Sequence, residues 1–201
     1  MIEKIDNAMQ LAVLLACGIC VYVRLFRTRS RVWVPLALFY TCHTLATGYW
    51  LLYLSFFGRT PQYSYISDPG WYAAALFLCV LLQMGEKKRP DLKNPLPWLA
   101  PLFSAAAFLF FIQWGDYLGN LVAAVVIGSL GWLSIHSLQR RGADRIFAAA
   151  CLLYYVLQYA IWISSCFWTD DTLANPYFWF DFLQTGNLIF LYRSWRKAVL
   201  A

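Results

Sequence analysis

The sequence is poor in charged residues. Asp, Glu, Lys and Arg make up 13% of its 201 residues, whereas 61% are hydrophobic and the mean hydropathy is +0.55. A soluble domain carries roughly 25% charged residues. This composition excludes a soluble globular domain and predicts an integral membrane protein.

Signatures of catalysis and of bound cofactors are also missing. The chain has no Gly-rich phosphate loop, no HExxH or GxSxG motif, and no pair of carboxylates at catalytic spacing. Six cysteines fall inside apolar stretches, and only Cys17 and Cys20 lie one helical turn apart without a second matching pair. We therefore expect core cysteines, no metal ion, no cofactor and no enzyme activity.

Seven apolar stretches are present. A membrane-spanning helix needs about 20 apolar residues, with a range of roughly 17–25. The stretches are 8–23, 33–57, 69–85, 95–114, 119–138, 146–168 and 176–192. They predict an all-α integral membrane protein with seven transmembrane helices in one domain, residues 1–201. Six spans are the main alternative, because the first stretch is short.

Positive charge is gathered in four clusters about two spans apart, and of the sixteen Lys and Arg residues only Lys4 and Arg59 lie elsewhere. The clusters are Arg24/Arg27/Arg29/Arg31, Lys87/Lys88/Arg89/Lys93, Arg140/Arg141/Arg145 and Arg193/Arg196/Lys197. Cytoplasmic loops of membrane proteins hold an excess of Lys and Arg. The pattern predicts an outside N-terminus, a cytoplasmic C-terminus and contact with anionic lipid. It gives no indication of nucleic-acid binding.

The two halves of the chain share landmarks in the same order. Each half has a Gly, a Trp and a Pro that align: Gly18 with Gly128, Trp50 with Trp162, and Pro69 with Pro176. A basic turn follows the first helix of each half. We therefore predict two parallel three-helix units joined by a linker helix. The units are 8–93 and 117–198, and the linker is 94–116.

This 3+1+3 layout, the chain length and the predicted outside N-terminus resemble those of the SWEET sugar carriers and the PnuC vitamin transporters. The resemblance implies a transporter with a midplane cavity between the two repeats. The segment SDPGWYAAALFL at 67–78 resembles segments that open a helix in seven-helix input modules of bacterial signalling proteins. That second resemblance implies a sensor. The expected location is a bacterial inner (plasma) membrane.

Polar residues interrupt the last apolar stretch. Asp181, Gln184 and Asn187 follow one another at intervals of three and therefore share one helix face. Ionisable residues within a membrane are costly and usually face the interior of the bundle. We expect the three side chains to bind a ligand or an ion. A polar clamp that only holds helices together is the alternative.

The second stretch has a matching polar face with His43, Thr47 and Trp50. His43 lies near the middle of the membrane, where it is expected to face Asp181 as a ligand contact or as a protonation-coupled pair. A structural histidine with both nitrogens satisfied is the alternative.

The sixth stretch presents Tyr155, Gln158 and Trp162 on the corresponding face. Trp50 and Trp162 would then be the aromatic walls of a central cavity suited to a sugar, a nucleoside or a similar heterocycle. Alternatively, both tryptophans belong to the outer interfacial belt.

The sequence thus favours a small-solute transporter that needs no nucleotide-binding machinery in this chain. A seven-helix sensor is the second hypothesis. A membrane-embedded enzyme acting on lipid is the third, and it would need Asp181 and His43 within hydrogen-bond reach. The identity of the ligand, the coupling ion and the oligomeric state, a homo-oligomer included, stay open.

Overall fold

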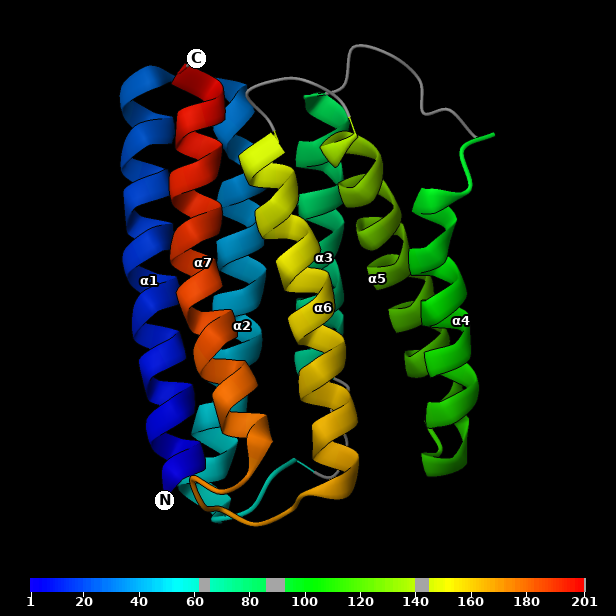
Figure 1. Ribbon diagram of the computed structural model, residues 1–201. Helices are drawn as coiled ribbons and strands as arrows, with labels where there is room; N and C mark the ends of the chain where they lie inside the picture. The colour runs from blue at the N-terminus through cyan, green and yellow to red at the C-terminus, as the bar shows by residue number, and fades with distance from the viewer. Residues whose placement is uncertain (62–65, 86–92, 140–144, 201) are drawn as a thin grey trace.

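The computed structural model describes residues 1–61, 66–85, 93–139 and 145–200, and these residues form seven α-helices and no strand (Figure 1). The helices are α1 (Ile2–Thr28), α2 (Val34–Phe57), α3 (Ser67–Met84), α4 (Leu99–Phe111), α5 (Tyr117–Leu138), α6 (Arg145–Phe167) and α7 (Pro176–Leu200). Short 3-10 turns precede α2 (Arg31–Trp33) and flank α4 (Leu96–Trp98 and Ile112–Trp114). The all-α class is confirmed.

Six of the helices form a closed ring. α1 packs on α2, α2 on α3, α3 on α5, α5 on α6, α6 on α7, and α7 on α1. α4 lies outside the ring against α5, and Tyr155 of α6 reaches it by donating a hydrogen bond to the Ala100 carbonyl (3.0 Å). Close approach is possible there because Gly131 of α5 has no side chain; a Cβ on it would lie 2.7 Å from the Cβ of Ala100.

Four helical segments are both long and apolar enough to cross a membrane. They are Ile2–Thr28, Leu96–Trp114, Tyr117–Leu138 and Arg145–Phe167. α2 and α7 are also long, at 24 and 25 residues, but polar side chains such as His43, Thr47 and Asp181 lower their hydropathy. These polar side chains are buried inside the ring.

Large apolar side chains are exposed on the outward faces of the helices. Examples are Ile19, Leu45, Phe56, Leu109 and Leu183, each more than half exposed. A monomeric soluble protein rarely exposes so much contiguous apolar surface. Apolar outer faces around a polar interior suit a bundle surrounded by lipid.

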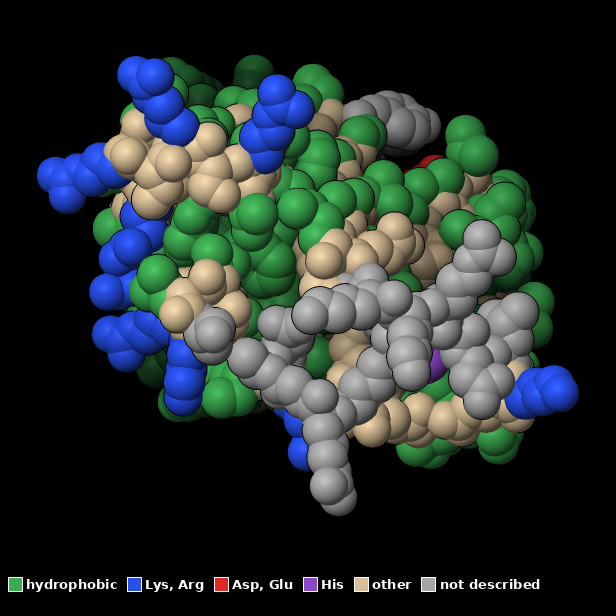
Figure 2. Space-filling view, turned by 90° about the horizontal axis from the view of Figure 1, so that it is seen from above, with side chains coloured by type: hydrophobic (Ala, Val, Ile, Leu, Met, Phe, Trp, Pro, Cys, Tyr) green, Lys and Arg blue, Asp and Glu red, His purple; other side chains and the backbone are tan. Residues whose placement is uncertain are grey.

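The N- and C-termini lie at opposite ends of the bundle (Figure 1). The two ends differ in the number of basic side chains. Lys and Arg side chains surround the end that holds the C-terminus (Figure 2). Those described are Arg24, Arg27, Arg29, Arg31, Lys93, Arg145, Arg193, Arg196 and Lys197. The rest of the predicted clusters, Lys87, Lys88, Arg89, Arg140 and Arg141, lie outside the described residues.

Two helices extend beyond the apolar stretches predicted for them. α1 begins at Ile2 and continues to Thr28, so its first turns include Asp6 and Asn7, which the span 8–23 leaves out. α7 extends to Leu200, eight residues beyond the predicted end. In both cases the helix continues past the apolar stretch, because the backbone hydrogen bonds of a helix form with polar as well as with apolar side chains.

Candidate functional site

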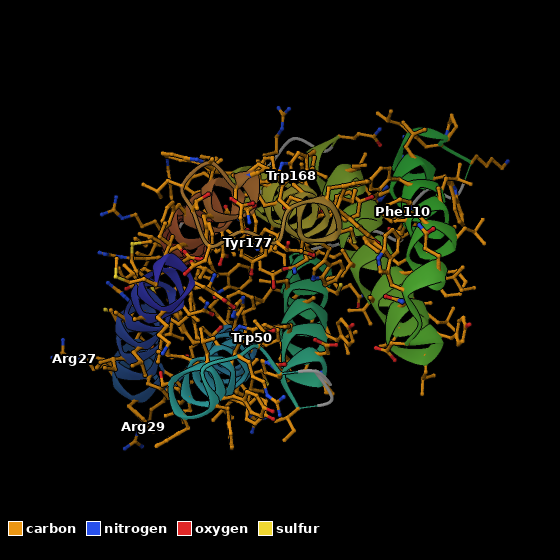
Figure 3. The ribbon with its side chains drawn as sticks, turned by 90° about the horizontal axis from the view of Figure 1, so that it is seen from below. Arg27, Arg29, Trp50, Phe110, Trp168 and Tyr177 are labelled. Carbon is orange, nitrogen blue, oxygen red and sulfur yellow. The ribbon has the colours of Figure 1, made fainter. Side chains whose placement is uncertain are left out.

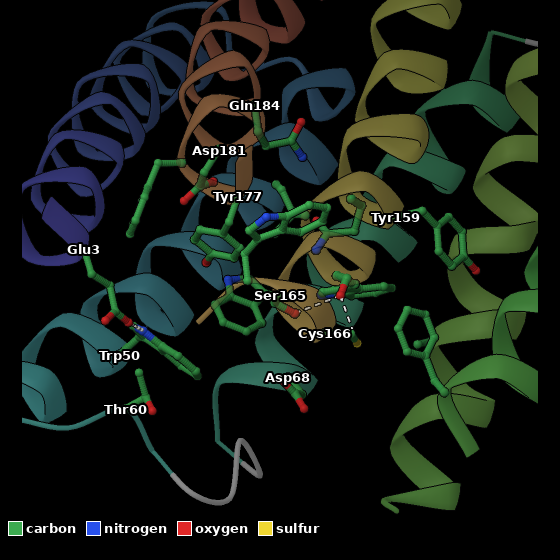
Figure 4. Close-up of a pocket in the computed structure, with 18 of the residues that line it drawn as sticks. Glu3, Trp50, Thr60, Asp68, Tyr159, Ser165, Cys166, Tyr177, Asp181 and Gln184 are labelled. Carbon is green, nitrogen blue, oxygen red and sulfur yellow. Dashed lines mark hydrogen bonds between the residues drawn. The ribbon is translucent and has the colours of Figure 1, made fainter. Parts of the chain in front are cut away.

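A cavity of about 520 Å³ opens in the half of the bundle nearer the N-terminus, and α4 as well as the six helices of the ring contribute to its lining (Figure 4). It extends from exposed Thr60 and Asp170 to buried His43 and Gln184. This volume is within the range of roughly 300–1,000 Å³ of small-molecule sites.

A chain of hydrogen bonds forms the floor of the cavity. The Gln10 amide nitrogen donates to Asp181 Oδ1 (2.7 Å), and the Thr47 hydroxyl donates to Gln10 Oε1 (3.1 Å). His43 Nδ1 lies 3.4 Å from the same hydroxyl. The hydroxyl has one proton, which it donates to Gln10, so the bond between His43 and Thr47 requires the tautomer in which His43 Nδ1 is the donor. All the donors in the chain therefore point toward the Asp181 carboxylate.

Polar groups beside this chain have unused hydrogen-bonding capacity. Asp6 is fully buried in hydrogen-bond contact with Asp181, so the two carboxyl groups share one proton, and no other described group bonds to Asp6. Gln184, one turn further along α7, is 2% exposed, and both its amide oxygen and its amide nitrogen are unpaired. Buried polar groups are normally hydrogen-bonded, so each of these has unused capacity for a ligand or for water.

Aromatic rings form the walls. Trp50 packs on Trp71 with ring centres 5.7 Å apart, and its indole nitrogen donates to Glu3 Oε1 (3.3 Å). Trp162 contacts Tyr159 edge to face at 5.6 Å. Seen from the N-terminal end, Trp50, Tyr177 and Trp168 lie around the interior, whereas Phe110 lies on the separate α4 (Figure 3).

The structure brings six of the nine predicted site residues to this cavity: His43, Trp50, Gln158, Trp162, Asp181 and Gln184. Trp50 and Trp162 lie on its walls. His43 and Asp181 are joined through Thr47 and Gln10 and have no direct hydrogen bond.

The other three predicted residues are not among those that line the cavity. Thr47 is fully buried and belongs to the hydrogen-bond chain of the floor. Tyr155 is turned toward α4, where its hydroxyl binds the Ala100 carbonyl. Asn187 donates to the Ala150 carbonyl of α6 (3.1 Å), so it joins two helices as a polar clamp does.

Sequence reasoning missed the contribution of α1. Asp6, Asn7 and Gln10 are buried on the inner face of this helix, and Asn7 and Gln10 line the cavity. Their spacing of i, i+1 and i+4 within an otherwise apolar segment could have indicated them. Beginning the span at residue 8 assigned Asp6 to the outside instead.

Beyond the floor, the half of the bundle nearer the C-terminus is packed. Tyr40 is fully buried, and its hydroxyl donates to the Leu188 carbonyl of α7 (2.6 Å). Phe39, Tyr154 and Trp33 are also almost completely buried at or beyond this level. The cavity therefore communicates with one end of the bundle.

Comparison with models of known protein families, with curated proteins and with solved structures found no match to this chain.

Proposed function

We propose that this protein crosses the membrane seven times, with its N-terminus outside and its C-terminus in the cytoplasm of a bacterial cell. Three observations support the proposal: seven helices that alternate in direction along the chain, apolar outer faces, and basic residues at the end that holds the C-terminus. Basic residues mark the cytoplasmic side of membrane proteins. The aromatic cavity then faces the outside.

Reporter fusions in a bacterial host test this orientation. A green fluorescent protein fused after Leu200 is expected to fluoresce, and alkaline phosphatase at the same site is expected to be inactive. Phosphatase fused after Thr172, in the loop between α6 and α7, is expected to be active. The reverse pattern at both sites would contradict the orientation.

We further propose that the protein is a small-solute transporter whose site is the cavity between two three-helix units. The observation that carries this proposal is the cavity with a buried polar floor and aromatic walls. The arrangement of the ring also supports it, since α3 meets α5 and α7 meets α1. A twofold relation between α1–α3 and α5–α7 would produce these two equivalent contacts, with α4 as the outer linker.

Uptake by proteoliposomes tests the transport function. Radiolabelled ribose, uridine, thiamine and choline are offered in parallel to vesicles with and without the protein. Saturable accumulation of at least one solute, several-fold above empty vesicles, is expected. If none of the four is bound or accumulated, the proposal is wrong.

A sensor that binds the solute without moving it is the second candidate. The packed inner half favours it, because Tyr40 and its bond to Leu188 join α2 and α7 below the floor. A solute that stabilises the purified protein but does not accumulate in vesicles would support the sensor over the transporter.

A further inference from the structure

The cavity has a strongly one-sided charge. Six carboxylate side chains belong to its lining: Glu3, Asp68, Asp116, Asp170, Asp171 and Asp181. Among the described residues that line it there is no Lys or Arg. The two basic side chains at this end of the bundle, Lys4 and Arg59, are exposed and are not part of the lining. The interior therefore has a negative potential that repels anions and attracts cations.

The deepest of these carboxylates is poorly compensated. Asp181 is 5% exposed, and its partners are the neutral amide of Gln10 and the buried carboxyl group of Asp6, neither of which brings a positive charge. At the mouth, by contrast, Asp171 pairs with the amino group of Met1. Burying negative charge is costly unless a positive charge or several donors compensate it. The inner part of the cavity therefore contains a negative charge that a cationic ligand would compensate.

Gln184 is an independent indication of a ligand at the same depth. It lies one turn from Asp181 on α7, lines the cavity and is almost completely buried, yet both of its polar atoms are unpaired (Figure 4). Its amide offers one acceptor and two donor hydrogens to a molecule that also reaches Asp181.

The walls select the kind of cation. Indole and phenol rings from four helices line the cavity, among them Trp50, Trp71, Tyr72, Trp162 and Tyr177. The faces of such rings attract alkylated ammonium groups and cationic heterocycles. A metal ion would need converging ligands instead, and the described residues contain no cluster of three or more His, Cys, Asp or Glu able to hold one.

We propose that the ligand of this cavity is a small organic cation, with a quaternary ammonium or a positively charged ring nitrogen. This inference rests on the proposed solute-binding function and names its substrate class. The cationic group lies near Asp181 and Asp6 between aromatic rings, and a polar substituent of the ligand meets the Gln184 amide. Neutral molecules of the same shape lack the attraction to the carboxylates.

Thermal unfolding of the purified full-length protein tests this inference with two matched pairs of probes. Choline is compared with 3,3-dimethylbutanol, its neutral isostere, and 1-methylnicotinamide is compared with neutral nicotinamide. We expect at least one cation to raise the unfolding temperature and its neutral partner to bind at least tenfold more weakly. Phosphocholine is included because lipid headgroups also carry ammonium. Phosphocholine is expected to bind weakly, because the carboxylates of the cavity repel its phosphate. If phosphocholine raised the unfolding temperature as much as choline does, the ligand would be a lipid headgroup.

Two tryptophan variants separate binding at the walls from general stability. Trp50→Leu is expected to weaken cation binding at least tenfold. Trp114→Leu, a matched change of an exposed tryptophan outside the lining, is expected to leave it unchanged. Equal or stronger binding of ribose, uridine or the neutral isosteres would overturn the cation inference and leave the solute-binding function standing. No shift with any of these compounds would overturn both.

Discussion

Asp181→Asn is expected to reduce solute uptake by about 100-fold or more while the yield of folded protein stays the same. The carboxylate is the buried end of the hydrogen-bond chain from His43, and it faces the cavity. Truncating one partner of a buried charge pair costs roughly 2–5 kcal/mol, and each 1.4 kcal/mol is about tenfold in binding. The Asn side chain still accepts from Gln10, so the fold loses little. Uptake by proteoliposomes, normalised to folded protein, measures the effect.

Two further variants make this result specific. Asp181→Glu keeps the charge and is expected to retain part of the uptake. Asn187→Ala removes another polar side chain of the same α7 face, one that binds the Ala150 carbonyl outside the cavity. It is expected to lower the unfolding temperature and to preserve uptake. Unchanged uptake in Asp181→Asn would exclude the carboxylate from the site, and equal losses in both variants would indicate a structural role only.

Much of the fold could be predicted, because lipid imposes strong rules on a sequence. An apolar stretch of a given length must form a helix to satisfy its backbone, so the number and order of the helices followed from hydropathy. The ends of α1 and α7 did not follow, because both helices continue into polar residues beyond their apolar stretches. The ring, with α4 excluded, depends on tertiary packing, such as the contact that Gly131 permits with Ala100.

The site could be predicted in part. Asp181 and Gln184 were indicated by helical spacing, and the structure places both at the cavity. Spacing alone also selected Asn187. Each step of three residues turns the side chain by about 60° around the helix, so Asn187 contacts α6 and does not line the cavity. Gln10 was missed because its importance comes from two partners, Asp181 and Thr47, that are distant in the sequence.

The largest effect on stability is expected for Tyr40→Ala. Tyr40 is fully buried one turn beyond His43, where its Cβ lies 3.5 Å from the Cβ position of Gly18 in α1 and its hydroxyl binds Leu188 of α7. Removing a buried aromatic side chain costs about 3–5 kcal/mol in lost contacts and in the void that remains. Thermal unfolding of the variant, measured with the intrinsic tryptophan fluorescence, is expected to show the lowest unfolding temperature among the variants described.

Two matched variants show where this stability comes from. Tyr40→Phe keeps the ring and removes one hydrogen bond, so it is expected to cost about 0.5–1.5 kcal/mol. Phe26→Ala removes an aromatic ring from the outward face of α1, where the side chain is 74% exposed, and is expected to change stability little. If Tyr40→Ala and Phe26→Ala had the same effect, the packed layer below the floor would not be what holds α1, α2 and α7 together. A larger loss of stability from Phe to Ala than from wild type to Phe at position 40 would mean that ring packing, more than the bond to Leu188, stabilises this layer.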